Sequence, residues 1–137
     1  MRVFLDSSAL AKKYIAEKGS ERVRALWQAA EEISLSVLCV PEVLSACIRL
    51  MREKKIDKND YQAIKSGFLH DIEDTSLINV VPAIIVGAVR CLEGATMRTL
   101  DAIHVASAMS IGSDLFVTAD SRQAEGARAM KLQTELV

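Results

Sequence analysis

The chain has 137 residues, a length that suits one domain with a single hydrophobic core. Half of the residues are apolar but only 4% are aromatic, which favours an aliphatic core of the layered α/β kind. The formal net charge of −1 argues against a strongly basic protein that coats nucleic acid. It leaves room for a nucleic-acid enzyme in which an acidic metal pocket has a local basic rim.

Apolar runs with strand character alternate along the chain with helical patterns that carry their own start and stop signals. In chain order, the sequence predicts a strand at 2–5, helices at 8–16 and 20–30, a strand at 33–36, a helix from Pro41 to the charged segment 52–55, a helix from the turn at 56–60 to about Asp74, a strand at 77–81, helices at 82–94 and 100–110 (capped by Thr99), a strand at 115–118, a helix that starts at Asp120, and a terminal strand at 132–137.

This alternation of strands and helices is typical of a parallel sheet with helices on both of its faces. We therefore expect an α/β protein, a three-layer α/β/α sandwich with a central, mainly parallel sheet. No linker-like or low-complexity segment divides the sequence, so residues 1–137 are expected to form a single domain.

Neither the cysteines nor the apolar segments point to secretion or to a membrane. Cys39, Cys47 and Cys91 lack metal-site spacing and are expected to be buried thiols. The first strand begins at residue 2, which leaves no signal peptide. The longest apolar stretch, Leu77 to Val89, is interrupted and is shorter than the roughly 20 residues that a spanning helix needs. The expected location is cytoplasmic.

Four acidic residues stand where predicted strands or helices begin or end. Asp6 and Asp120 follow strands, whereas Glu42 and Asp101 lie in the first turns of helices. The ligand crevice of an open α/β sheet lies beyond the carboxyl ends of its strands, so these acids are expected to converge there. For any one of them alone, stabilisation of a helix N-terminus is an equally good explanation. Together they favour a site, because crowded carboxylates repel one another unless a cation is present.

Oxygen ligands of this kind suit Mg²⁺ or Mn²⁺. Such an ion activates water for attack on a phosphodiester, and a second ion, if present, stabilises the leaving oxygen. Ser7, Ser8 and Thr118 adjoin the proposed ligands and are placed to orient water or phosphate. Helix capping and hydrogen bonding at the strand ends explain these hydroxyls equally well.

Four segments in order, at 3–14, 41–43, 100–106 and 117–120, resemble PIN-domain ribonucleases. The nearest group is the VapC toxins of prokaryotic toxin–antitoxin pairs, and the likeness covers nearly the whole chain. It carries the family's acids over to Asp6, Glu42, Asp101 and Asp120, as ligands of Mg²⁺ or Mn²⁺ and as activators of water. Ser121-Arg122-Gln123 follow where many relatives have another acid or amide, so the choice between one and two metal ions stays open.

The resemblance further implies endonucleolytic cleavage of RNA, a homodimer, and inhibition by a cognate antitoxin whose basic side chain commonly blocks the acidic pocket.

Single residues outside the four acids are further candidates. Arg122 is one candidate contact to RNA, and a basic cluster at 49–55 is another. His104, one helical turn after Asp101, could hydrogen-bond an acid or a phosphate, but it is expected to be a structural or supporting residue rather than a ligand. The mean hydropathy of +0.19 suggests an apolar interface patch, for which the helices at 61–74 and 23–30 are candidates.

Two other readings of the same residues stay in view. In the first, the protein is a PIN-like binding module whose acidic pocket holds a basic partner peptide without catalysis. In the second, it is a phosphotransfer receiver or phosphatase. Such sites generally use paired acids on the first strand or an Asp-x-Asp motif, and this chain has Asp6-Ser7-Ser8 instead.

Overall fold

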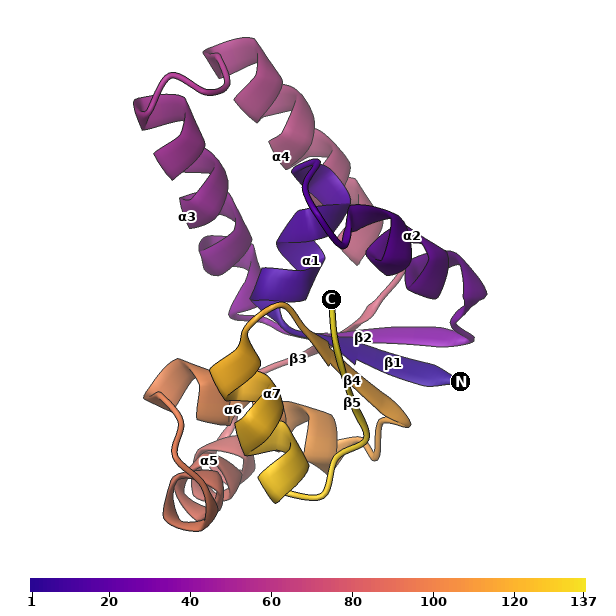
Figure 1. Cartoon of the computed structure of the whole chain (residues 1–137), viewed down its shortest axis with the longest axis vertical. Helices are drawn as coiled ribbons and strands as arrows, with labels where there is room; N and C mark the ends of the chain where they lie inside the picture. Colours follow the sequence, from indigo (N-terminus) through magenta and orange to yellow (C-terminus); the bar gives the residue numbers. More distant parts are fainter.

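A computed structural model describes all 137 residues and shows five strands and seven helices (Figure 1). In chain order they are β1 (Arg2–Leu5), α1 (Ser7–Tyr14), α2 (Ser20–Ala29), β2 (Glu32–Ser36), α3 (Cys39–Arg52), α4 (Lys58–Ile72), β3 (Ser76–Ile78), α5 (Pro82–Gly94), α6 (Thr99–Ser110), β4 (Leu115–Thr118), α7 (Ser121–Ala129) and β5 (Thr134–Leu136).

The five strands form one sheet in the order β3-β2-β1-β4-β5, and every neighbouring pair is parallel. The chain builds outward from β1 to β3 and then returns to the other side of β1 with β4. The strand order therefore reverses between β1 and β4, and a crevice for a ligand is expected outside the carboxyl ends of these two strands.

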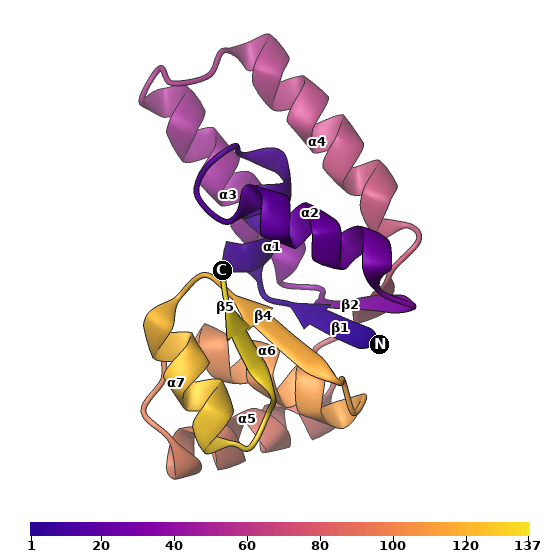
Figure 2. The ribbon, with the colours of Figure 1, turned by 45° about the vertical axis from the view of Figure 1, so that its right-hand side comes forward.

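Helices cover both faces of the sheet, which confirms the predicted three-layer α/β/α sandwich. Side chains of β1 alternate between the faces: Val3 and Leu5 pack with α1 to α4, whereas Phe4 packs with α5 to α7. In Figures 1 and 2, α1 to α4 lie above the sheet and α5 to α7 below it. The second face also holds a stacked pair of rings, Phe4 and Phe116, whose centroids are 5.6 Å apart.

Helix starts account for the main differences from the sequence prediction. Helix α3 begins at Cys39, so Pro41 lies within its first turn, where a missing N–H is tolerated. Helix α6 begins at Thr99, and Arg98 is its N-cap, with extended backbone and no capping side chain. The prediction that Thr99 caps this helix was therefore wrong, because its backbone is already helical.

Exposed apolar side chains gather on α5 rather than on the two helices proposed from sequence. Ile85, Val86, Val89 and Leu92 of this helix are exposed, and Gly87 lets it approach α6, where an added Cβ would lie 3.3 Å from that of Ala106. The three cysteines are buried and free, as expected. No helix is both long and apolar enough to cross a membrane.

Candidate active site

The carboxyl ends of β1 and β4 are joined by a network of hydrogen bonds around Asp6. This residue is the N-cap of α1, and its Oδ1 accepts hydrogen bonds from the Ala9 backbone N–H at 2.9 Å and the Ser8 hydroxyl at 2.7 Å. Its Oδ2 accepts a hydrogen bond from the hydroxyl of Thr118, at the end of β4, at 2.5 Å. The Asp6 carboxylate thus ties the first helix to both central strands.

Asp6 is almost completely buried, with 1% of its surface exposed. Burial raises the pKa of its carboxyl group, while the hydrogen bonds from Thr118, Ala9 and Ser8 oppose this rise. Both carboxylate oxygens of Asp6 accept hydrogen bonds within the protein, so Asp6 supports the site without being exposed at its surface.

Glu42, in the first turn of α3, is held by a serine and a histidine. Its Oε1 accepts a hydrogen bond from the Ser7 hydroxyl at 2.9 Å and lies 2.6 Å from Nε2 of His104. Burial favours a higher pKa for Glu42, but the contacts with His104 and Ser7 outweigh it and lower the pKa. Glu42 is therefore held as a carboxylate with a fixed orientation.

Asp101, in the first turn of α6, and Asp120, the N-cap of α7, share one arginine. Nε of Arg98 lies 3.5 Å from Oδ2 of Asp101, and Nη2 lies 3.3 Å from Oδ2 of Asp120. Burial raises the pKa of Asp101 and the nearby Asp120 carboxylate adds to the rise, whereas Arg98 acts in the opposite direction. The two acids are therefore close enough to repel each other, and a cation already offsets that repulsion.

A cavity of about 340 Å³ lies in front of these groups. Glu42 and Asp101 line it from α3 and α6, and Arg98, Thr99 and Leu100 complete its wall. The structure thus brings acids from two helices onto one cavity and places a third, Asp120, one arginine away. The sequence predicted this convergence from the positions of the acids at strand ends and helix starts.

The donor set suits a hard divalent cation, because carboxylate oxygens are the ligands that Mg²⁺ and Mn²⁺ prefer. The guanidinium group between Asp101 and Asp120 shows directly that this position attracts positive charge. As the side chains stand, no three His, Cys, Asp or Glu residues are close enough to hold a metal ion together. Binding of a metal by more than two of the acids therefore requires side-chain movement.

The predicted substrate contacts lie in three different settings. The Ser7 hydroxyl is part-buried and donates to Glu42, while Thr118 is fully buried and donates to Asp6. Arg122 is exposed, its backbone N–H donates to Asp120 at 2.9 Å, and its side chain forms no hydrogen bond or salt bridge. Of the three, the side chain of Arg122 is the most accessible to a ligand.

Two residues of this site were not assigned to it from the sequence. Arg98 precedes the segment 100–106, and its position three residues before Asp101 was the available signal. His104 was expected to be a structural or supporting residue able to hydrogen-bond an acid, and it is buried and contacts Glu42. Its Nδ1 is buried without a hydrogen-bond partner. The sequence spacing placed His104 near Asp101 but did not identify Glu42, which comes from another helix, as the acid it contacts.

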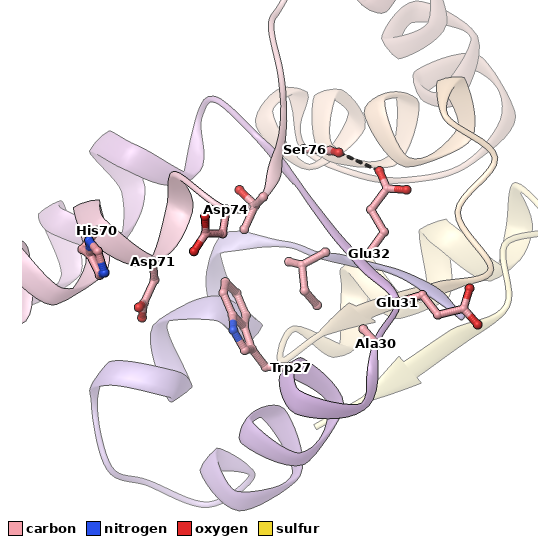
Figure 3. Close-up of a pocket in the computed structure, with 10 residues that line it drawn as sticks. Trp27, Ala30, Glu31, Glu32, His70, Asp71, Asp74 and Ser76 are labelled. Atoms are coloured by element: carbon pink, nitrogen blue, oxygen red, sulfur yellow. Dashed lines mark hydrogen bonds between the residues drawn. The ribbon is translucent and has the colours of Figure 1, made fainter.

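A second acid-lined cavity, of about 300 Å³, lies at the opposite end of the sheet (Figure 3). It opens beside the first residues of β2 and β3, and Trp27 forms part of its wall. Three of its four acids have partners inside the protein: Glu32 accepts a hydrogen bond from Ser76 at 2.6 Å, Asp71 pairs with Lys13, and Glu31 pairs with the N-terminal amino group. In Figure 3, Glu31 and Glu32 extend in different directions, and no three acids of this cavity are close enough to hold a metal ion.

The fold and the acid-lined edge place the chain among α/β proteins that bind their ligand beyond the carboxyl ends of parallel strands. Residues 3–129 match the family model described as the PIN domain, and the chain belongs to this family. The resemblance inferred from the four sequence segments is thereby confirmed.

Individual relatives agree with this assignment. Ribonuclease VapC45 of Mycobacterium tuberculosis (strain CDC 1551 / Oshkosh) is 27% identical over 129 residues, which cover 93% of this chain and 90% of that protein. FitAcB from Neisseria gonorrhoeae has a TM-score of 0.74 at 13% identity, over 96% of this chain and 95% of its own. A toxin-antitoxin complex from Klebsiella pneumoniae has a TM-score of 0.70 at 14% identity, over 93% of each chain. At these identities the two solved structures show a shared fold.

Proposed function

We propose that this protein is an endoribonuclease that depends on Mg²⁺ or Mn²⁺ and acts as the toxin of a VapBC-type toxin–antitoxin pair. The observation that carries the proposal is the gathering of Glu42, Asp101 and Asp120 around one cavity and one cation, at the carboxyl edge of the sheet. Membership of the PIN family and similarity to a protein named a ribonuclease support the same reaction.

Each acid has a proposed role that follows from its surroundings. Asp6, Glu42, Asp101 and Asp120 are the proposed metal ligands; the last three are partly accessible, whereas Asp6 is buried. A bound divalent cation supplies activation of water and neutralisation of charge on the phosphate. Asp6 is the fourth proposed acid, and from its buried position it holds Thr118, which in turn accepts a hydrogen bond from the Asp120 backbone N–H at 3.0 Å.

The groups proposed to assist RNA binding act at different depths. Ser7 and Thr118 hold Glu42 and Asp6 by hydrogen bonds, so their contribution is to fix the carboxylates. Arg122 is free to contact a phosphate from the surface beside Asp120. Because the net charge of the chain is close to zero, we expect only a few basic residues to bind the RNA backbone.

Cleavage of purified RNA with and without Mn²⁺ tests the proposal. The wild-type protein should produce fragments with Mn²⁺ or Mg²⁺ and none with EDTA, and sequencing of the ends should reveal the target. Asp101→Asn and Asp120→Asn should each lose cleavage while circular dichroism shows an unchanged fold. Cleavage that survives both substitutions with the same metal dependence contradicts the proposal.

The biological part of the proposal concerns partners. A structural neighbour is itself a toxin-antitoxin complex, which supports a cognate antitoxin as the partner of this chain in the cytoplasm. A homodimer is proposed as well, and the exposed apolar side chains of α5 provide surface of the kind that a protein contact uses. Co-purification of the product of an adjacent small gene, and sedimentation of the isolated chain, test these two points.

The binding-module alternative is favoured by one specific observation: the guanidinium group of Arg98 already occupies the space between Asp101 and Asp120. A pocket that accepts an arginine of its own chain is also suited to a basic partner peptide. Calorimetric titration with Mn²⁺ separates the two functions, because the module should bind no metal whereas the nuclease should bind it through its acids.

A further inference from the structure

The acidic pocket already contains a cation that belongs to the chain itself. Arg98 is the N-cap of α6, and its guanidinium group reaches one carboxylate in the first turn of α6 and another at the start of α7. Both contacts are made to the Oδ2 atoms of Asp101 and Asp120. The two Oδ2 atoms therefore face a shared cation already.

The same two carboxylates therefore face a choice between cations. With Arg98 in place, their mutual repulsion is offset without a metal ion, and no three potential ligands lie close enough to hold one. A guanidinium group and a metal ion compete for the same Oδ2 atoms, because each positive charge weakens the binding of the other. A metal ion that binds both carboxylates therefore favours departure of Arg98 from these oxygens.

The contact is also suited to being reversible. The Arg98 side chain is 77% exposed, compared with 16% for Asp101 and 27% for Asp120. Its distances of 3.3 and 3.5 Å are at the long end of the range for hydrogen bonds, and exposed ion pairs contribute little to stability. Little therefore holds the arginine once another cation competes for the acids.

A second position, facing the cavity of Glu42 and Asp101, is available to the Arg98 side chain. Arg98 is the one basic residue among the five that line this cavity. A guanidinium group binds phosphate with the same planar fork with which it binds carboxylate. Of the other four lining residues, Glu42 and Asp101 are acids and Thr99 and Leu100 are uncharged, so Arg98 is the cavity residue suited to an RNA phosphate.

We infer that Arg98 is a two-position residue: it neutralises Asp101 and Asp120 in the metal-free protein and binds a phosphate of the RNA substrate once a metal ion has taken those carboxylates. This inference rests on the proposed nuclease function. In one position Arg98 competes with the metal ion, and in the other it binds the substrate.

Calorimetric titration with MnCl₂ tests the first position. Arg98→Gln should bind Mn²⁺ about fivefold more tightly than the wild type, as expected when a competing ion pair is removed. Arg90→Gln is the matched control: Arg90 is exposed, forms no salt bridge, and its loss changes net charge equally. Its Mn²⁺ affinity should equal that of the wild type. Equal affinities in all three proteins, or equal tightening in both variants, overturn the inference.

Steady-state cleavage of a fluorescent RNA oligonucleotide at saturating Mn²⁺ tests the second position. Arg98→Gln should raise KM about fivefold and leave kcat within about twofold, because the lost contact is to a phosphate away from the ligands. An unchanged KM removes the substrate role. If the wild type cleaves RNA and Arg98→Gln has the same Mn²⁺ affinity and KM, this inference is refuted while the proposed nuclease function stands. Absence of Mn²⁺ binding and cleavage in every protein refutes the proposed nuclease together with it.

Discussion

Two cavities of this molecule are lined with acids, one at each end of the parallel sheet, and they differ in where the fold places those acids. At the carboxyl edge, Glu42 and Asp101 come from the first turns of different helices and face the same space. At the amino edge, Glu32 and Asp71 are held by a serine and a lysine of the protein. The acids of the carboxyl edge also have partners, but they come from separate helix starts and line one cavity, and this placement is what distinguishes the candidate site.

The topology of the sheet explains the difference. All five strands are parallel, so the residues that follow them are delivered to one edge, beside helix N-termini that favour negative charge. The opposite edge receives the residues that precede the strands and the carboxyl ends of helices such as α4. Acids can be present there, but nothing in the fold aims them at a common point.

The largest expected effect comes from neutralising one acid in each cavity. Asp101→Asn should lower RNA cleavage by on the order of 10²–10³, because a ligand of the catalytic cation is lost. Asp74→Asn, in the amino-edge cavity, should leave the rate unchanged. Initial rates of cleavage with Mn²⁺ measure both. A similar loss in the two variants removes the functional distinction between the cavities.

The next effect concerns stability. Asp6→Ala removes three accepted hydrogen bonds and leaves the buried Thr118 hydroxyl without its acceptor, so it should cost about 2–4 kcal/mol of unfolding free energy. Glu32→Ala, at the other edge, should cost about 1 kcal/mol or less, since Glu32 is exposed. Urea denaturation measures the two values, and equal costs contradict the structural role assigned to Asp6.

A smaller effect is expected from the serines that hold a glutamate in each cavity. Ser7→Ala frees Glu42 from one hydrogen bond and should reduce kcat by about two- to tenfold. Ser76→Ala removes the matching bond to Glu32 and should not alter cleavage. Comparison of kcat for the two variants sharpens the contrast, and a slower Ser76→Ala enzyme argues against it.

The smallest effect is a dependence of stability on pH at the amino edge. Burial raises the pKa of Asp71, but hydrogen bonds from Lys13 and Tyr14 outweigh it and lower the pKa. A lowered folded pKa stabilises the protein above the unfolded pKa of about 3.9, and this contribution disappears as pH falls through the folded value. Asp71→Asn should therefore cost about 0.5–1 kcal/mol at pH 7 and less at pH 3. Urea denaturation at both pH values shows whether this cost shrinks or stays constant.

Local sequence signals predicted most of the fold. Apolar runs located most strands, and alternation of apolar and polar residues located β2. Asp6 and Asp120 were correctly placed before helices, because capping depends on neighbours two or three residues away. The boundaries moved by a few residues: α1 begins at Ser7 rather than Ser8, and β5 covers only Thr134–Leu136. The apolar patch was placed on the wrong helices because hydropathy does not show which face of a helix is covered.

The sequence by itself determined the α/β/α architecture and the four acids at element boundaries, because hydrophobic patterns and the start and stop signals of helices are properties of short segments. Tertiary structure alone decided how those acids are engaged. It buried Asp6 in hydrogen bonds, brought His104 against Glu42 from 62 residues away, and set Arg98 between Asp101 and Asp120. Such contacts join side chains from separate helices, and their geometry exists only once both helices have packed on the sheet.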